Sequence, residues 1–148
     1  MLLINFLIQK KINQIIISNS IKNNNHEILK DINIESYKYK NNFDNTLFFG
    51  IYEINDYKKF NNHKGKKWIF WCGNDMNICH SPRLKNIKEL LKNNNIMDHL
   101  YCNNLLAKNF KKLNINGIWI STHMLNNPKN HFTFIISSYN NSKWFERN

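Results

Sequence analysis

One continuous apolar stretch, residues 67–73, decides the fold class. Its sequence is KWIFWCG, with only apolar residues between Lys67 and Cys72. Five further runs of this kind lie at residues 14–18, 46–52, 98–102, 117–121 and 132–137. None of the six runs alternates strictly between apolar and polar residues. Such runs indicate strands that are covered on both faces, as in a parallel sheet.

Helical patterns separate these runs at residues 55–60, 81–91 and 103–113. The second pattern is the clearest, because Pro82 stands at a favoured first position and one apolar stripe follows it. Strands and helices that alternate in this way predict right-handed βαβ units. We therefore expect an α/β fold: a single Rossmann-like three-layer domain over residues 1–148, with a mainly parallel sheet of five or six strands. Residues 32–37 are a candidate extra strand.

The composition is dominated by three residue types that A/T-rich codons encode. The 148 residues include 30 Asn, 21 Ile and 19 Lys, against one Ala and no Val. The formal net charge is +11, from 21 Lys and Arg against 10 Asp and Glu, but only Arg83 and Arg147 are Arg. Specific readers of phosphates and bases depend on Arg. The basic charge is therefore attributed to codon usage, and nucleic acid is not the expected partner.

Several classes of protein are excluded by simple patterns. No apolar run approaches the ~20 residues that a spanning helix needs. The apolar start of the chain has no preceding basic region and no small-residue cleavage site, which argues against a signal peptide. Three cysteines do not make a disulfide framework. The expected location is the cytoplasm, or the host cytoplasm or a virion if the protein is viral.

The loops after the predicted strands are the expected place for a ligand, since ligands of open α/β sheets bind beyond the carboxyl ends of the strands. The loop after residues 67–73 is the most distinctive: Asn74 and Asp75 offer an amide and a carboxylate that can pair with sugar hydroxyls. Trp71 offers an apolar face. The same Gly-Asn-Asp sequence is also a common turn signal, in which Asp75 caps the next turn of the chain. The candidate ligand-binding residues are Gly50, Tyr52, Glu53, Trp71, Gly73, Asn74 and Asn103.

Three segments carry a resemblance to a known family: LFFGIY at residues 47–52, DYKKFNNHKGKKWIFWCGND at 56–75, and a strand followed by a helix at 98–113. They resemble the N-terminal half of a GT-B-type glycosyltransferase, of a kind found in large DNA viruses with A/T-rich genomes. The family pattern is an aromatic-rich strand that ends in Trp-Gly-Gly or a similar sequence, then a polar residue and Asp. Here Cys72 replaces the first Gly, and Asn74 fills the polar position.

The resemblance implies two Rossmann-like halves, of which this chain is the acceptor half. Residues 132–148 are then a linker or the beginning of a missing donor-binding half. The implied ligand is a sugar or glycan acceptor, and a second chain that supplies the donor-binding half is an implied partner. The implied chemistry uses a nucleotide-sugar donor and needs no metal or other cofactor.

For catalysis, Asp75 or His123 is the candidate general base toward an acceptor hydroxyl. The alternative from another class is a non-catalytic interaction module, a subunit of a virion or complex, or one that binds an anionic polymer through its Lys residues. A zinc site is not favoured, because the six residues between Cys72 and Cys79 do not fit the spacing of structural zinc ligands. A Cys-His nucleophile pair has no third group to orient it.

Overall fold

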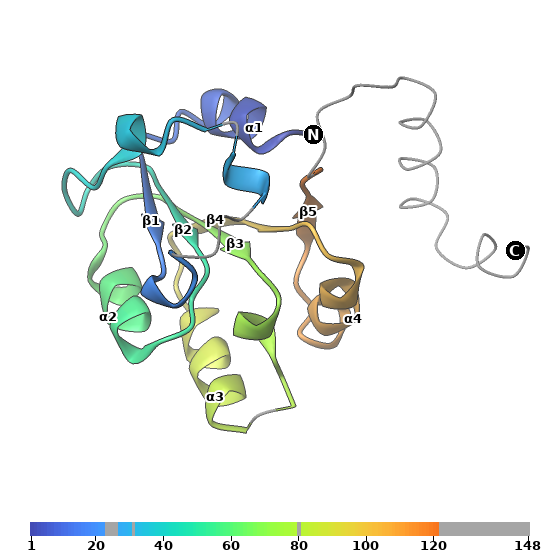
Figure 1. The fold of residues 1–148 in the computed structure, drawn as a ribbon. Coiled ribbons are helices and arrows are strands. Elements are labelled where there is room, and N and C mark those ends of the chain that lie inside the picture. The colour runs from blue at the N-terminus through green and yellow to red at the C-terminus, as the bar shows by residue number, and fades with distance from the viewer. Residues whose placement is uncertain (23–26, 31, 80, 122–148) are drawn as a thin grey trace, which may run out of the picture.

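The computed structural model describes residues 1–22, 27–30, 32–79 and 81–121, and the expected strand at 132–137 lies outside them. It confirms an α/β fold with one five-stranded sheet, all parallel, in the order β1-β2-β3-β4-β5 (Figure 1). The strands are β1 (Gln14–Ile17), β2 (Thr46–Phe49), β3 (Lys67–Trp71), β4 (Ile96–Tyr101) and β5 (Gly117–Trp119). The α-helices are α1 (Leu3–Gln9), α2 (Ile54–Asn62), α3 (Ser81–Leu90) and α4 (Asn104–Lys112). Four 3-10 turns are η1 (Asn19–Ile21), η2 (Glu27–Leu29), η3 (Ile34–Tyr37) and η4 (Asn74–Met76).

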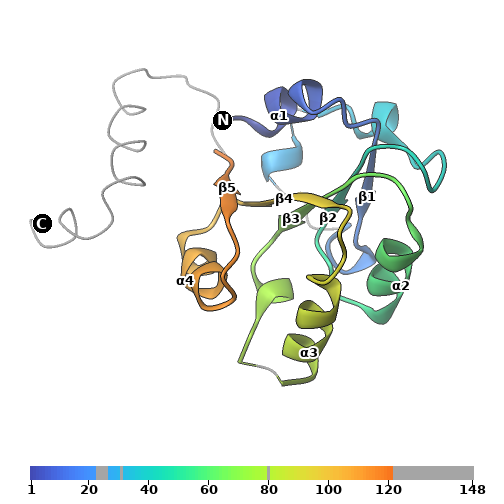
Figure 2. The same ribbon diagram turned by 180° about the vertical axis from the view of Figure 1, so that it is seen from behind.

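Layers of chain cover both faces of the sheet. Figures 1 and 2 show α2, α3 and α4 on one face and α1 on the other. Successive strand residues point to opposite faces, so Leu47 and Phe49 pack with α1 while Phe48 packs with α2. The same alternation sends Trp68 and Phe70 to one layer and Ile69 and Trp71 to the other. A strand with no solvent-facing side reads as a continuous apolar run, which explains the pattern that predicted the sheet.

The connection from β1 to β2 differs from the three helical connections that come after it. Its buried residues Ile21, Ile28 and Ile32 belong to the core on the α1 face. It crosses the sheet in the same direction as the later connections but on the opposite face, so its hand is opposite to theirs. Right-handed connections are the strong rule for parallel strands. The prediction of uniformly right-handed βαβ units therefore does not hold at β1.

The candidate strand at residues 32–37 is wrong. Residues 34–37 form the turn η3, which lies against β1. Ile28 and Ile32, four residues apart, both point into the core on the α1 face. The segment therefore does not pair into the sheet and instead forms part of the layer that covers it.

The apolar start of the chain is an integral part of the domain. Leu3, Phe6 and Leu7 of α1 are buried on the sheet, whereas Ile8 is 67% exposed. Leu2 pairs in parallel with Ser121, beside β5. None of the helices described here is long and apolar enough to cross a membrane.

A buried polar row crosses the amino end of the sheet. Gln14, Thr46 and Lys67 are the first residues of three neighbouring strands, lie in register, and are each no more than 1% exposed. Gln14 Nε2 donates to Thr46 Oγ1 at 2.6 Å. The Lys67 ammonium lies 4.6 Å from the centroid of the Phe60 ring. Burial, reinforced by the nearby Lys64, lowers the pKa of Lys67 from its ordinary 10.5 to about 8.

Replacing this lysine by an apolar residue is expected to stabilise the protein at neutral pH. Because its folded-state pKa is lowered, holding Lys67 charged costs free energy below pH 8, and that cost disappears as the pH rises through 8 toward 10.5. Lys67→Met is expected to raise the free energy of unfolding by about 1–3 kcal/mol at pH 7 and to give no gain above about pH 10.5. Urea denaturation from pH 6 to 10.5 measures the difference. A variant that is less stable than the parent at pH 7 contradicts the expectation.

Candidate functional site

The carboxyl ends of the parallel strands bring most of the predicted ligand-binding residues to one edge of the sheet. Gly50, Tyr52 and Glu53 follow β2, and Asn103 follows β4. The remaining ones close β3 or follow it directly: Trp71, Gly73, Asn74 and Asp75. Glu53, Asn74 and Asn103 are exposed, and Tyr52 is half-buried. The other candidate base, His123, lies outside the described residues.

Asp75 joins the loops after β2 and β3. Its Oδ2 accepts from Ile51 N at 3.3 Å, and its Oδ1 accepts from Gly73 N at 2.9 Å. Cys72 N donates to both oxygens at 3.1 Å. Asp75 is 0% exposed. Here the carboxylate fastens two strand ends together, and its role as a general base stays a prediction.

The electrostatics of Asp75 result from this burial. Loss of solvent raises the pKa of its carboxyl from 3.8 to about 6, while the N–H donors of Cys72, Ile51 and Gly73 oppose the rise. The carboxyl is therefore mostly ionised at neutral pH and acts as an acceptor. Gly73 has φ +129°, in the region that favours glycine, and this conformation turns the chain so that its own N–H reaches Asp75.

A second buried carboxylate, Asp56, joins the ends of β1 and β2, and sequence reasoning missed both Asp56 and its partner Ser18. Ser18 Oγ donates to Asp56 Oδ2 at 2.6 Å, and both residues are buried. Asp56 Oδ2 also accepts from the backbone N of Tyr52 and of Glu53, as part of a capping box at the start of α2. Ser18 ends the first apolar run, so its place at a strand end was predictable, whereas its partner 38 residues away was not.

Ser20 and Glu53 form an exposed serine–carboxylate pair beside the buried pair of Ser18 and Asp56. The Ser20 hydroxyl donates to Glu53 Oε1 at 2.6 Å, and both side chains are exposed. Because the chain leaves β1 over one face of the sheet and leaves β2 over the other, the two loops diverge at this point. Divergence of adjacent loops at the carboxyl edge is the feature that creates binding crevices in open α/β sheets. Here it arises from the unusual hand of one connection, since the strand order itself never reverses.

Two aromatic side chains and one cation lie at the same edge. Burial and the neighbouring Asp75 raise the pKa of Tyr52, and burial raises the pKa of Tyr57 to about 12. The positive charge of Arg83 opposes the rise in pKa of both tyrosines. Arg83 Nη1 also donates to the carbonyl oxygen of Asn74 at 2.5 Å.

The Tyr57 hydroxyl is buried and has no hydrogen-bond partner in the described part of the chain. A buried hydroxyl without a partner contributes no hydrogen bond to the stability of the fold.

Trp71 does not present a face at this edge. Its side chain is 0% exposed, and its Nε1 donates to His99 Nδ1 at 3.1 Å. Burial lowers the pKa of His99 to about 4, so the ring is neutral at physiological pH and its Nδ1 is free of a proton to accept this bond. The pair fixes β3 against β4 inside the core, and any sugar contact by Trp71 stays a prediction.

The cysteines at the edge show no sign of reactivity or metal binding. Cys72 and Cys102 are partly buried free thiols, and burial raises the pKa of each. A raised pKa keeps a thiol protonated and therefore a weak nucleophile. No group of three His, Cys, Asp or Glu residues within the described ranges is placed to hold a metal ion.

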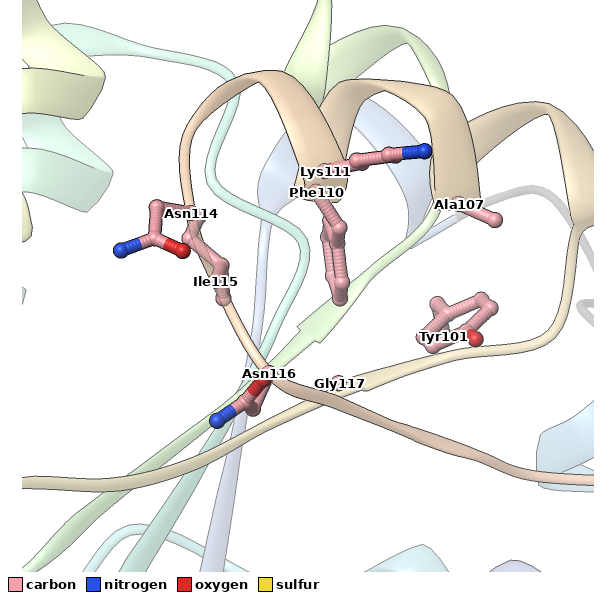
Figure 3. A pocket seen from close by; sticks show the side chains of 8 residues that line it. All are labelled: Tyr101, Ala107, Phe110, Lys111, Asn114, Ile115, Asn116 and Gly117. Carbon is pink, nitrogen blue, oxygen red and sulfur yellow. The ribbon is translucent and has the colours of Figure 1, made fainter.

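Two hollows lie away from this edge. The smaller, of about 350 Å³, sits between α4 and the chain that enters β5 (Figure 3). The Phe110 ring points from α4 toward Gly117, and a Cβ at Gly117 would come within 2.2 Å of that ring. Tyr101 packs edge-to-face on Phe110 at 4.9 Å. This hollow therefore lies at the border of a cluster of packed aromatic rings. The larger, of about 620 Å³, runs along the outer edge of β1.

No family model matches the chain, and no curated protein or solved structure is significantly similar to it.

Proposed function

We propose that this domain binds a sugar or glycan acceptor on the carboxyl edge of its sheet, where the loops after β1 and β2 diverge. The observation that carries the proposal is the exposed Ser20–Glu53 pair at that divergence, with a 2.6 Å hydrogen bond between hydroxyl and carboxylate. The Ser20 hydroxyl donates its proton to Glu53, so the oxygen atoms of both side chains are left to accept hydrogen bonds from sugar hydroxyls. Both side chains of this pair are exposed and so accessible to a ligand.

Neighbouring groups support the same chemistry. Asn74 and Asn103 expose amides in the next two loops along the edge, and amides donate and accept at once. Tyr52 adds a partly exposed ring beside Glu53. Arg83 adds a cation for an acidic or phosphorylated sugar. Its charge opposes the rise in pKa of both Tyr52 and Tyr57. Glycosyl transfer, with Asp75 or His123 as base and a donor-binding half from a second chain, is the extension that the family resemblance suggests.

The test is binding of a panel of glycans and sugar nucleotides, measured by saturation-transfer NMR and calorimetry, with the variant Ser20→Ala. This change deletes one exposed hydroxyl and leaves the α2 cap intact. We expect the Kd of a bound sugar to rise about 5- to 20-fold, the effect of one or two lost hydrogen bonds. The control is Ser36→Ala, an exposed serine on η3, which should leave the Kd unchanged.

Tyr57→Phe provides an independent check. The Tyr57 hydroxyl has no partner among the described residues, so its removal should leave the free energy of unfolding unchanged or slightly higher. Because this hydroxyl is buried, the variant is expected to bind the sugar as tightly as the parent. No binding across the panel, or equal binding by the parent and Ser20→Ala, would contradict the proposed site.

A further inference from the structure

The outer edge of β1 has unpaired backbone groups that face a groove. β1 pairs only with β2 in the described structure. Gln14 N donates to Asn45 O and Ser18 N donates to Phe49 O. Since N–H groups alternate sides along a strand, those of Ile15 and Ile17 point away from β2. No backbone group of the described residues pairs with them.

The groove along this edge has two walls of different character. Its floor is residues 15–17, one wall is η3 with the residues after it, and the other wall is α2. Figure 1 shows β1 outermost in the sheet with α2 beside it. The volume is about 620 Å³. Ile34 is the apolar residue of the η3 wall, and Lys59 with Asn62 forms the α2 wall.

The charge of the groove is positive. Its lining includes Lys22, Lys38 and Lys59 against a single acid, Glu35. Glu35 already forms an ion pair with Lys38. Within the described ranges neither Lys22 nor Lys59 makes an ion pair. An occupant therefore meets two uncompensated cations, one at the carboxyl end of β1 and one on the α2 wall.

We propose that the edge of β1 is a docking groove for an extended acidic peptide of a partner protein, which adds to the sheet as a strand beside β1. Strand addition takes its affinity from main-chain hydrogen bonds and its specificity from alternate side chains. The N–H and C=O groups of Ile15 and Ile17 supply the hydrogen bonds. In an added strand, side chains alternate between the two walls, so acidic residues face Lys59 while apolar residues face Ile34.

The groove is independent of the sugar site proposed above, because its lining contains none of Ser20, Tyr52 or Glu53. An unpaired edge is otherwise a hazard of self-association, which proteins limit by placing lysines there. If the lysines only prevent self-association, the groove binds no peptide. Peptide binding therefore separates this protective role of the lysines from the proposed docking.

The test uses a capped hexapeptide of alternating Glu and Val, titrated into the full chain and followed by amide hydrogen exchange. We expect the exchange of the Ile15 and Ile17 amides to slow at least tenfold at saturation, while the Ile16 amide, already bonded to β2, is unchanged. Lys22→Glu/Lys59→Glu is expected to raise the peptide Kd at least tenfold. The control Lys85→Glu/Lys88→Glu makes the same charge change on exposed positions of α3 and should weaken binding by less than threefold.

Other outcomes overturn the proposal. They are an absence of protection at Ile15 and Ile17 at millimolar peptide, and equal weakening by the two double variants, which would indicate attraction by net charge alone. Protection that depends on protein concentration without peptide would assign the edge to a second copy of this chain. Binding of a single-stranded oligonucleotide that displaces the peptide from the same residues would assign it to a polyanion.

Discussion

Asp75→Ala is expected to lower the free energy of unfolding by about 3–5 kcal/mol, the range for removing one partner from a buried charged network. The carboxylate is 0% exposed, and the backbone N–H groups of Ile51, Cys72 and Gly73 depend on it. Its removal leaves these donors without an acceptor in an interior that excludes water. A domain of this size is stable by only about 5–15 kcal/mol, so the loss is a large share of the total.

Urea denaturation followed by Trp fluorescence measures this effect. Asp75→Asn keeps the side-chain volume and one acceptor oxygen, so a smaller loss of about 2–3 kcal/mol is expected; it supplies the measurement if the alanine variant does not fold. Glu89→Gln on α3, an exposed carboxylate paired with Lys92, is the control and should change the stability by less than about 0.5 kcal/mol. A change of that small size at Asp75 would show that the carboxylate does not join the two loops.

The burial of Asp75 governs how an activity assay must be interpreted. A variant at Asp75 that loses sugar binding or transfer can do so because the loops after β2 and β3 separate. Ser20→Ala does not carry this ambiguity, because Ser20 is exposed and its hydroxyl donates to the equally exposed Glu53. Variants at Ser20 therefore test the site, and variants at Asp75 test the scaffold beneath it.

Phe6→Ala is expected to destabilise the protein by about 3–5 kcal/mol, the usual cost of deleting a large buried aromatic side chain. Phe6 is 0% exposed in the core that joins α1 to the sheet. The same helix contains its own control, Ile8, which is 67% exposed. Ile8→Ala is expected to change the stability by no more than about 0.5 kcal/mol.

Thermal and urea denaturation of the two variants decide whether residues 1–9 belong to the folded unit. If α1 is docked as described, the Phe6 variant unfolds at clearly lower urea and the Ile8 variant does not. Equal, small effects at both positions would mean that the segment contributes little to the core, and the face that carries Leu47 and Phe49 would then need another cover.

The strands were predictable because a strand that is covered on both faces carries a continuous apolar run, as in β2 and β3, which are buried at every residue. Residues 67–73 contain β3, and the other four runs within the described ranges contain or overlap β1, β2, β4 and β5. The helix α4 was predictable to within a residue, because Asn103 caps it and Leu106 and Phe110 face the sheet. Such local signals depend only on neighbours in the chain.

The turn η3 and the helix α1 escaped prediction for the opposite reason. Both elements are short, Leu3–Gln9 and Ile34–Tyr37, so a short strand and a short helical turn have the same pattern until the surface that covers them is known. The partners of the candidate site escaped as well. Ser20 and Glu53 are 33 residues apart, and only the parallel pairing of β1 with β2 brings them together.

The amino-acid sequence by itself determined the five strands, the helices α2, α3 and α4, and the edge of the sheet at which the polar loops gather, because apolar periodicity is a local property. Only the tertiary structure decided which face of the sheet each connection covers and which strand edge has no partner strand. It also decided that Asp75 is a buried carboxylate that hydrogen-bonds two loops together, and not an exposed one. These depend on contacts between segments far apart in the chain, whose free energy no single stretch of residues encodes.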